Sequence, residues 1–132
     1  DDTTDAFHGQ LLVAEFATCS ERELRVPFIV GADRSRTWVI TRGAGTLQLQ
    51  HDHRLKDGSP DPVNLYGGMA RAGGSARSQS FPADARTAGL IPAAVTNVWT
   101  LSLSEDGQRL TYHLERDGRP RFTAELARVA KR

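Results

Sequence analysis

The sequence has a single cysteine, only two lysines, few aromatic residues and no long hydrophobic run. Because Cys19 is alone, no disulfide can form within the chain, and we expect this residue to be a small buried hydrophobic side chain. No stretch of about 18 apolar residues occurs, so no membrane-spanning helix is expected. The 17 basic residues nearly balance the 16 acidic ones, and a net charge of +1 gives no reason to predict nucleic-acid binding.

A length of 132 residues suits one domain that covers residues 1–132, and such a chain can bury roughly two thirds of its unfolded surface. The chain starts with the polar run Asp1-Asp2-Thr3-Thr4-Asp5 and without methionine. We expect residues 1–6 to form a flexible segment. This start is consistent with an exported and processed chain or with a shortened one, and we favour export to the periplasm or the medium.

The C-terminal third carries the clearest secondary-structure pattern. Two turn sequences, Glu105-Asp106-Gly107 and Arg116-Asp117-Gly118, separate three runs in which apolar and polar residues alternate. The pattern predicts three strands of an antiparallel meander with one apolar and one polar face. The expected apolar positions are Trp99, Leu101, Leu103, Leu110, Tyr112, Leu114, Phe122, Ala124 and Leu126.

The N-terminal part predicts further strands at 10–18, 24–30, 36–42 and 46–54, the last two joined by a turn at Gly43-Ala44-Gly45. Pro27 predicts an edge position or a bulge because proline cannot donate to a ladder. Between residues 56 and 92 the pattern weakens. Residues Gly67 to Ser80 are expected to form a loop that is either functional or merely mobile.

About eight short strands joined by tight turns predict an all-β protein. An antiparallel up-and-down β-barrel of about eight strands is the preferred architecture, because closure removes exposed strand edges. A two-sheet β-sandwich is the alternative.

The strand order resembles that of lipocalin-like and streptavidin-like small barrels. The run Ala14-Glu15-Phe16-Ala17-Thr18-Cys19, followed by Val26-Pro27-Phe28, is similar to segments of small exported bacterial envelope proteins. The run Phe7-His8-Gly9-Gln10-Leu11 has the glycine but not the tryptophan of the lipocalin Gly-x-Trp signature. The resemblance implies an interior that either packs solid or holds one small ligand, with openings at the barrel ends.

The strand at 46–54 carries the main candidate site. Alternation along it sends Leu47, Leu49, His51 and His53 to one face. Residues two apart on a strand lie about 6.6 Å apart, so the two imidazoles could share one divalent metal ion. A third ligand would come from elsewhere, with His8, Asp57, Asp61 and Tyr66 as candidates. The alternative is that both histidines are hydrogen-bonded residues at the edge of the core.

We expect a ligand site at this end of the domain, formed by His51, His53, Asp57, Trp38, Tyr66 and Tyr112. No cofactor is predicted, although a divalent metal at the histidine pair is the alternative. The nucleophile motif Gly-x-Ser-x-Gly is absent, and Cys19 has no local histidine partner, so the sequence favours a binding protein over an enzyme.

Three functional hypotheses follow. The first is an exported, non-enzymatic protein that binds a small molecule or an envelope protein. The second is a metal-binding protein or metal-dependent enzyme that uses His51 and His53. The third is an inhibitor or assembly module that acts through a surface loop such as Gly67 to Ser80. An open cavity of roughly 300 Å³ or more beneath Trp38, Leu49 and Tyr112 would favour ligand binding, and a solid core would favour a module that acts through its surface.

Overall fold

A computed structural model describes residues 11–43 and 45–129, and within these ranges the chain forms ten strands and two short helical turns. The predicted flexible segment 1–6 and the candidate ligand His8 lie outside the described residues. The elements in chain order are β1 (Leu12–Ala14), β2 (Thr18–Cys19), β3 (Glu23–Val30), β4 (Asp33–Gly43), β5 (Thr46–His53), β6 (Tyr66–Met69), β7 (Ser78–Pro82), α1 (Ala85–Leu90), the 3-10 turn η1 (Pro92–Ala94), β8 (Val98–Leu103), β9 (Arg109–Arg116) and β10 (Arg119–Ala127).

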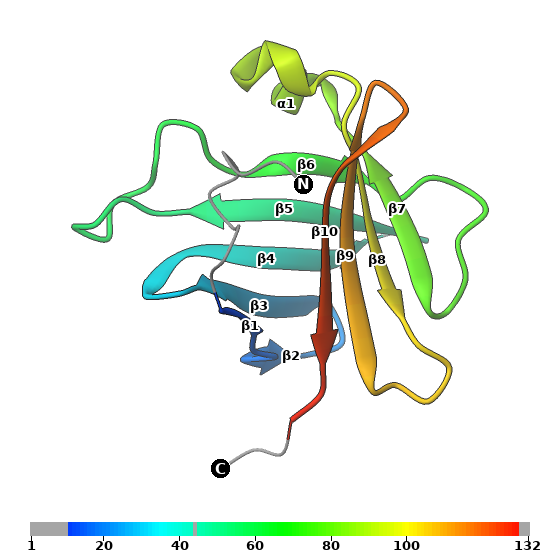
Figure 1. The fold of residues 1–132 in the computed structure, drawn as a ribbon. Coiled ribbons are helices and arrows are strands. Elements are labelled where there is room, and N and C mark those ends of the chain that lie inside the picture. Colours follow the sequence, from blue (N-terminus) through cyan, green and yellow to red (C-terminus); the bar gives the residue numbers. More distant parts are fainter. Residues whose placement is uncertain (1–10, 44, 130–132) are drawn as a thin grey trace.

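The strands form two antiparallel sheets. The first sheet has the order β1-β3-β4-β5-β6, with β2 also paired to β3, and the second has the order β10-β9-β8-β7. Figure 1 shows the strands of the two sheets crossing at a steep angle. The all-β class is therefore confirmed, and the two-sheet sandwich fits the arrangement. The preferred closed barrel is wrong, because no ladder joins β6 to β7 or β1 to β10 within the described residues.

The edge of the first sheet at β6 is covered by a helix instead of a strand. Asp84 caps α1 by accepting a hydrogen bond from the backbone N–H of Thr87 at 2.8 Å. The buried hydroxyl of Thr87 accepts from the N–H of Gly67 at 2.7 Å and donates to the carbonyl of Gly67 at 2.9 Å. Because these edge groups are satisfied by a side chain, β6 needs no further strand beside it, and the sheet stays open.

The chain passes tightly around this corner, which explains the dipeptide Gly67-Gly68. A Cβ atom at Gly67 would lie 2.0 Å from the carbonyl oxygen of Leu49, and one at Gly68 would lie 1.8 Å from the carbonyl oxygen of Pro82. Only glycine fits such close approaches between backbones. The segment expected to be one loop from Gly67 to Ser80 therefore begins and ends as strands.

The core is a stack of aromatic rings held between the two sheets. Trp38 of β4 stacks on Phe28 of β3, with ring centroids 4.7 Å apart, and on Tyr112 of β9, with centroids 4.6 Å apart. Phe122 of β10 meets Tyr112 edge-on at 6.0 Å. Leu49 has no exposed surface at all. Among the described residues, the space between Trp38, Leu49 and Tyr112 is therefore filled by side chains and does not hold the cavity of roughly 300 Å³ or more that would favour ligand binding there.

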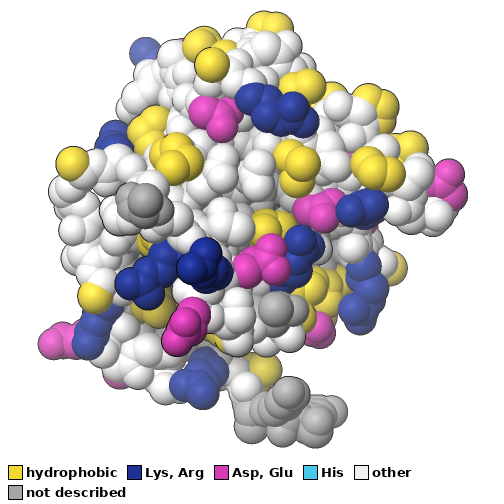
Figure 2. Space-filling view, turned by 180° about the vertical axis from the view of Figure 1, so that it is seen from behind, with side chains coloured by type: hydrophobic (Ala, Val, Ile, Leu, Met, Phe, Trp, Pro, Cys, Tyr) yellow, Lys and Arg dark blue, Asp and Glu magenta, His cyan; other side chains and the backbone are white. Residues whose placement is uncertain are grey.

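Charged side chains on the surface tend to pair locally. In Figure 2, basic and acidic side chains lie close to each other among uncharged ones. Asp52 is bound by Arg54 at 2.9 Å and approached by Arg25 at 3.8 Å. Cys19 is exposed, so the expectation that it is buried is wrong. Within the described residues no helix has the length and apolar character needed to span a bilayer.

Candidate functional site

The predicted histidine pair is divided by the structure. The strand is confirmed as β5, and both residues lie on it, but His51 enters the core whereas His53 stays at the rim. His51 is 3% exposed. Its Nδ1 lies 2.8 Å from the carbonyl oxygen of Tyr66, so Nδ1 carries the proton and donates it. Its Nε2, 2.9 Å from the hydroxyl of Tyr112, therefore accepts. Both ring nitrogens are occupied.

The environment keeps His51 neutral. Burial lowers the pKa of His51 to about 4, and the hydrogen bond to Tyr66 offsets only part of this effect. Burial also raises the pKa of the Tyr112 hydroxyl far above its usual range. A neutral imidazole and a neutral phenol thus share a hydrogen bond that joins the first sheet to the second. This is the chemistry of a satisfied buried polar pair.

The rings around His51 complete a closed cluster. Tyr66 stacks on His51 with ring centroids 4.6 Å apart, and Trp99 packs at 5.0 Å on a tilted plane. Four of the predicted ligand-site residues are therefore brought together, but as core. These four are Trp38, His51, Tyr66 and Tyr112.

The other two predicted residues lie apart from this cluster. The Nδ1 of His53 is 3.6 Å from a carboxylate oxygen of Asp61, and both side chains are about one quarter exposed. Asp57 lies on the surface, where its carboxylate accepts from the N–H of Ser59 at 2.9 Å. The hydroxyl of Ser59 donates to the same carboxylate, and this bond, together with the backbone one, lowers the pKa of Asp57. Asp57 thus serves a tight turn, and Asp61 is the carboxylate that reaches the histidine strand.

A metal ion on His51 would have to replace one of its two buried hydrogen bonds. Among the residues described, no group of three His, Cys, Asp or Glu side chains could hold a metal ion. His113 lies on the other face of its sheet from Tyr112, where its Nδ1 is 2.6 Å from the hydroxyl of Thr123. The metal hypothesis therefore lacks a complete ligand set in the part of the chain that the structure describes.

An apolar opening lies at the other end of the sandwich, where β4 turns into β5. We call it the inter-sheet cleft. Its volume is about 190 Å³. It is lined by Phe16, Leu24, Val26, Trp38, Ile40, Leu47, Ala76, Arg77, Ser78, Gln79, Phe81, Leu101, Ser102, Leu103 and Leu110.

The cleft has buried walls and a partly exposed mouth. Trp38 and Phe81 are almost completely buried, whereas Phe16 is 57% and Leu103 is 41% exposed. Arg77, at the mouth, is exposed and makes no ion pair with another described residue. The result is an apolar groove with one cation beside it. Sequence alternation marks these leucines as inward-facing, but it carries no sign that the sheets splay apart above them.

Comparisons with protein-family models, with curated proteins and with solved structures find no match to this chain. The site must therefore be interpreted from its own chemistry.

Proposed function

We propose that the protein is a non-catalytic binding module that takes a small amphiphile, with an alkyl body in the inter-sheet cleft and an anionic head near Arg77. The observation that carries this proposal is the apolar cleft itself, which opens to solvent between two rigid sheets. Exposed apolar surface of this kind marks binding sites more often than chance. The proposal includes export from the cytoplasm because segments of the chain resemble those of small envelope proteins.

The size of the cleft limits the ligand. A volume of 190 Å³ holds about six groups of the size of a water molecule, at roughly 30 Å³ each. This is below the range of about 300–1,000 Å³ that is usual for drug-sized ligands. A short alkyl chain fits, and a steroid or a large lipid does not. The ligand site is therefore proposed at the opposite end of the domain from His51, because the His51 end is packed solid.

The charge at the mouth selects the head group. The lining next to Arg77 is uncharged, and Ser78 and Ser102 hydrogen-bond to each other through their hydroxyl groups at 2.9 Å. The guanidinium of Arg77 is thus the charged group of the lining, and a carboxylate head suits it. Among the described residues, the lining contains no histidine, carboxylate, lysine or cysteine, so the two serine hydroxyl groups have no general base beside them, which supports binding without catalysis.

Calorimetric titration with butanoate, hexanoate and octanoate tests the proposal. Each buried methylene contributes about 0.8 kcal/mol, so affinity should rise about fourfold per methylene and stop rising once the cleft is full. Trp38 lines the cleft, so its fluorescence should change in parallel. Arg77→Gln should weaken octanoate binding, whereas Arg71→Gln, in the same connection but outside the lining, should not.

A plug variant provides the control for location. Ala76→Trp places a large ring at the mouth, and Ala72→Trp places the same ring on an exposed position that does not line the cleft. Octanoate binding should be lost in the first variant only. Equal binding by both variants, or no binding by the wild type, would contradict the proposal. A dimer in sedimentation experiments that Ala76→Trp dissociates would instead identify the cleft as an interface between copies.

A further inference from the structure

A second cavity lies at the opposite end of β9, beside the hairpin that joins β9 to β10. Its volume is about 560 Å³, and its lining residues are Arg116, Asp117, Arg119, Pro120 and Arg121. We call it the arginine pocket. Three arginines and one aspartate line it, in a chain whose overall net charge is only +1. Positive charge is therefore concentrated at this one hairpin.

The turn places two of the arginines directly opposite each other on neighbouring strands. Arg116 and Arg119 are direct partners in the ladder, joined by the two-residue turn Asp117-Gly118, in which both residues have φ values above +50°. Like charges directly opposite each other on neighbouring strands are destabilising. Arg116 and Arg119 thus form a cross-strand pair that costs stability without a compensating anion.

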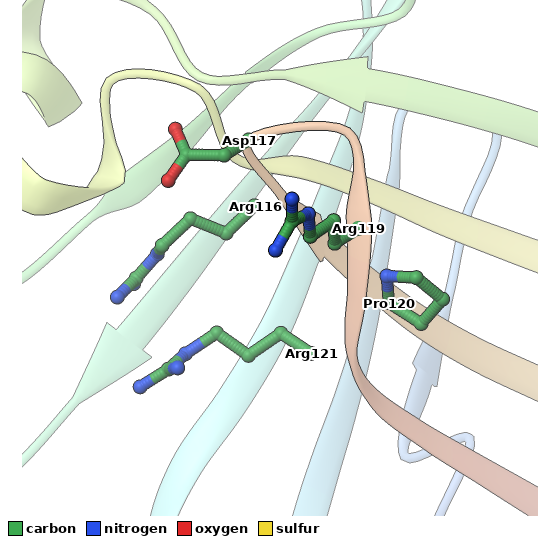
Figure 3. Close-up of a pocket in the computed structure, with 5 residues that line it drawn as sticks. All are labelled: Arg116, Asp117, Arg119, Pro120 and Arg121. Carbon is green, nitrogen blue, oxygen red and sulfur yellow. The ribbon is translucent and has the colours of Figure 1, made fainter.

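A bulge brings in the third arginine. The register shifts between Pro120 and Phe122, which leaves Arg121 as the extra residue of β10. Bulges re-aim the side chain that they contain. Figure 3 shows Arg121 and Arg116 extended side by side in the same direction, whereas the ring of Pro120 lies on the other side of the hairpin.

The guanidinium of Arg116 is held in place by a buried side chain. The Nε of Arg116 donates at 2.8 Å to the side-chain oxygen of Asn97, which is 3% exposed. This bond orients the guanidinium and leaves its two terminal nitrogens for another acceptor. Partial burial and the charge of Arg121 lower the pKa of Arg116, although an arginine stays protonated throughout the physiological range.

The acidic neighbour does not neutralise the group. The carboxylate of Asp117 accepts a hydrogen bond from the hydroxyl of Thr96 at 2.7 Å. Within the described residues, no carboxylate forms a salt bridge with Arg116, Arg119 or Arg121. The pocket therefore holds three guanidinium groups and one carboxylate, so two positive charges remain without a matching negative charge in its lining.

We propose that the arginine pocket binds a phosphate-bearing ligand, with Arg116 as the fixed fork and Arg119 and Arg121 as the contacts to the remaining phosphate oxygens. A carboxylate would occupy one guanidinium fork and leave two cations opposed. A phosphate group carries about −1.5 to −2 charges and three acceptor oxygens, which suits three cations. The pocket, at about 560 Å³, has room for a ligand larger than inorganic phosphate.

Calorimetric titration with inorganic pyrophosphate at pH 7.5 tests this site directly. The Arg119→Gln/Arg121→Gln variant should bind at least tenfold more weakly, because it loses two charged contacts and keeps the Arg116–Asn97 bond. The matched control is Arg34→Gln/Arg128→Gln, which removes the same charge at two exposed positions outside the pocket. The control should keep wild-type affinity.

Vesicle flotation distinguishes a soluble phosphate compound from a lipid headgroup. The probes are vesicles of phosphatidylglycerol and phosphatidylcholine in equal amounts, compared with phosphatidylcholine alone. Binding to the anionic vesicles that requires Arg119 and Arg121 supports a lipid source. Pyrophosphate binding without vesicle binding supports a soluble source. The proposal is overturned if wild type binds neither probe, or if both double variants bind equally well. Because the inter-sheet cleft lies at the other end of β9, these outcomes do not depend on the octanoate result.

Discussion

The hydrogen bond between His51 and Tyr112 ties the two sheets together, and Tyr112→Phe tests its role. The substitution removes one oxygen atom and keeps the ring, including its stacking on Trp38 at 4.6 Å. The Nε2 of His51 then loses a donor at 2.9 Å in a place where the two residues are only 3% and 7% exposed. A buried acceptor left without a partner costs about 1–3 kcal/mol. We expect the free energy of unfolding to fall by this amount.

Tyr66→Phe is the matched control. Its ring also packs on His51, but its hydroxyl makes no hydrogen bond with the described residues. We expect this variant to change stability by no more than about 0.5 kcal/mol. Urea unfolding followed by circular dichroism measures both variants, and an unchanged denaturant slope would show that only stability has changed.

A double variant separates the hydrogen bond from general packing. Tyr112→Phe combined with His51→Leu removes both partners of this bond, so neither is left unpaired by the loss of the other. The carbonyl of Tyr66 loses its donor both in His51→Leu and in the double variant, so this loss cancels in the comparison. The combined loss should be smaller than the sum of the two single losses by about 1 kcal/mol. Equal losses in Tyr112→Phe and Tyr66→Phe, or strict additivity in the double variant, would refute the inter-sheet bond as a source of stability.

Two further predictions concern buried polar groups. Because burial lowers the pKa of His51 from 6.5 to about 4, the unfolded chain takes up a proton first. Stability should be complete above pH 6.5 and fall by up to about 3 kcal/mol toward pH 4; urea titrations should show the loss in His53→Gln but not in His51→Leu. Thr87→Val removes the hydroxyl that accepts a hydrogen bond from the N–H of Gly67, so the free energy of unfolding should fall by about 1–3 kcal/mol. An unchanged exchange rate of the Gly67 amide proton would contradict that assignment.

Local patterns were sufficient to predict three of the four strands of the second sheet, whereas β7 was missed because most of it was assigned to a loop. The turn at Asp117-Gly118 needs two residues with positive φ, and the sequence supplies aspartate and glycine there. Alternation on both sides then places Tyr112 and Ala124 inward, and both are buried. Each of these features depends on residues a few positions apart, so single-sequence reasoning could find them.

The first sheet was harder because its edges depend on distant contacts. Pro27 was expected at an edge position or a bulge. β3 lies between β1 and β4, so it is not an edge strand, and the irregularity in its pairing with β4 falls between Phe28 and Val30. The pairing of β1 with β3 covers Phe28 to Val30 and that of β2 covers Leu24 and Arg25, so Pro27 lies in the gap between them. Similarly, β6 contains Gly67-Gly68, which weakens a strand pattern, because the backbones of β5 and β7 approach too closely for a side chain.

The candidate site shows the same limit. Alternation correctly placed His51 on the inward face, but the residue that decides its chemistry, Tyr112, lies 61 positions away on the other sheet. The pattern could not distinguish a histidine that faces a cavity from one that faces a phenol. The spacing His51-x-His53 therefore suggested shared ligands, whereas packing assigns one residue to the core and the other to a rim contact with Asp61.

The steep crossing of the two sheets explains why candidate sites lie at both ends of the molecule. Sheets that cross in this way pack tightly where they overlap and diverge where they do not. The overlap holds the aromatic stack around Trp38 and the His51–Tyr112 bond, and it leaves no room for a ligand. The divergence leaves Leu110 at one end of β9 and Arg116 at the other partly accessible. At about 3.4 Å per residue these ends lie roughly 20 Å apart. The length of β9 therefore separates an apolar cleft from a cationic pocket. Because the core between them is packed solid, a ligand bound at one end does not contact the other.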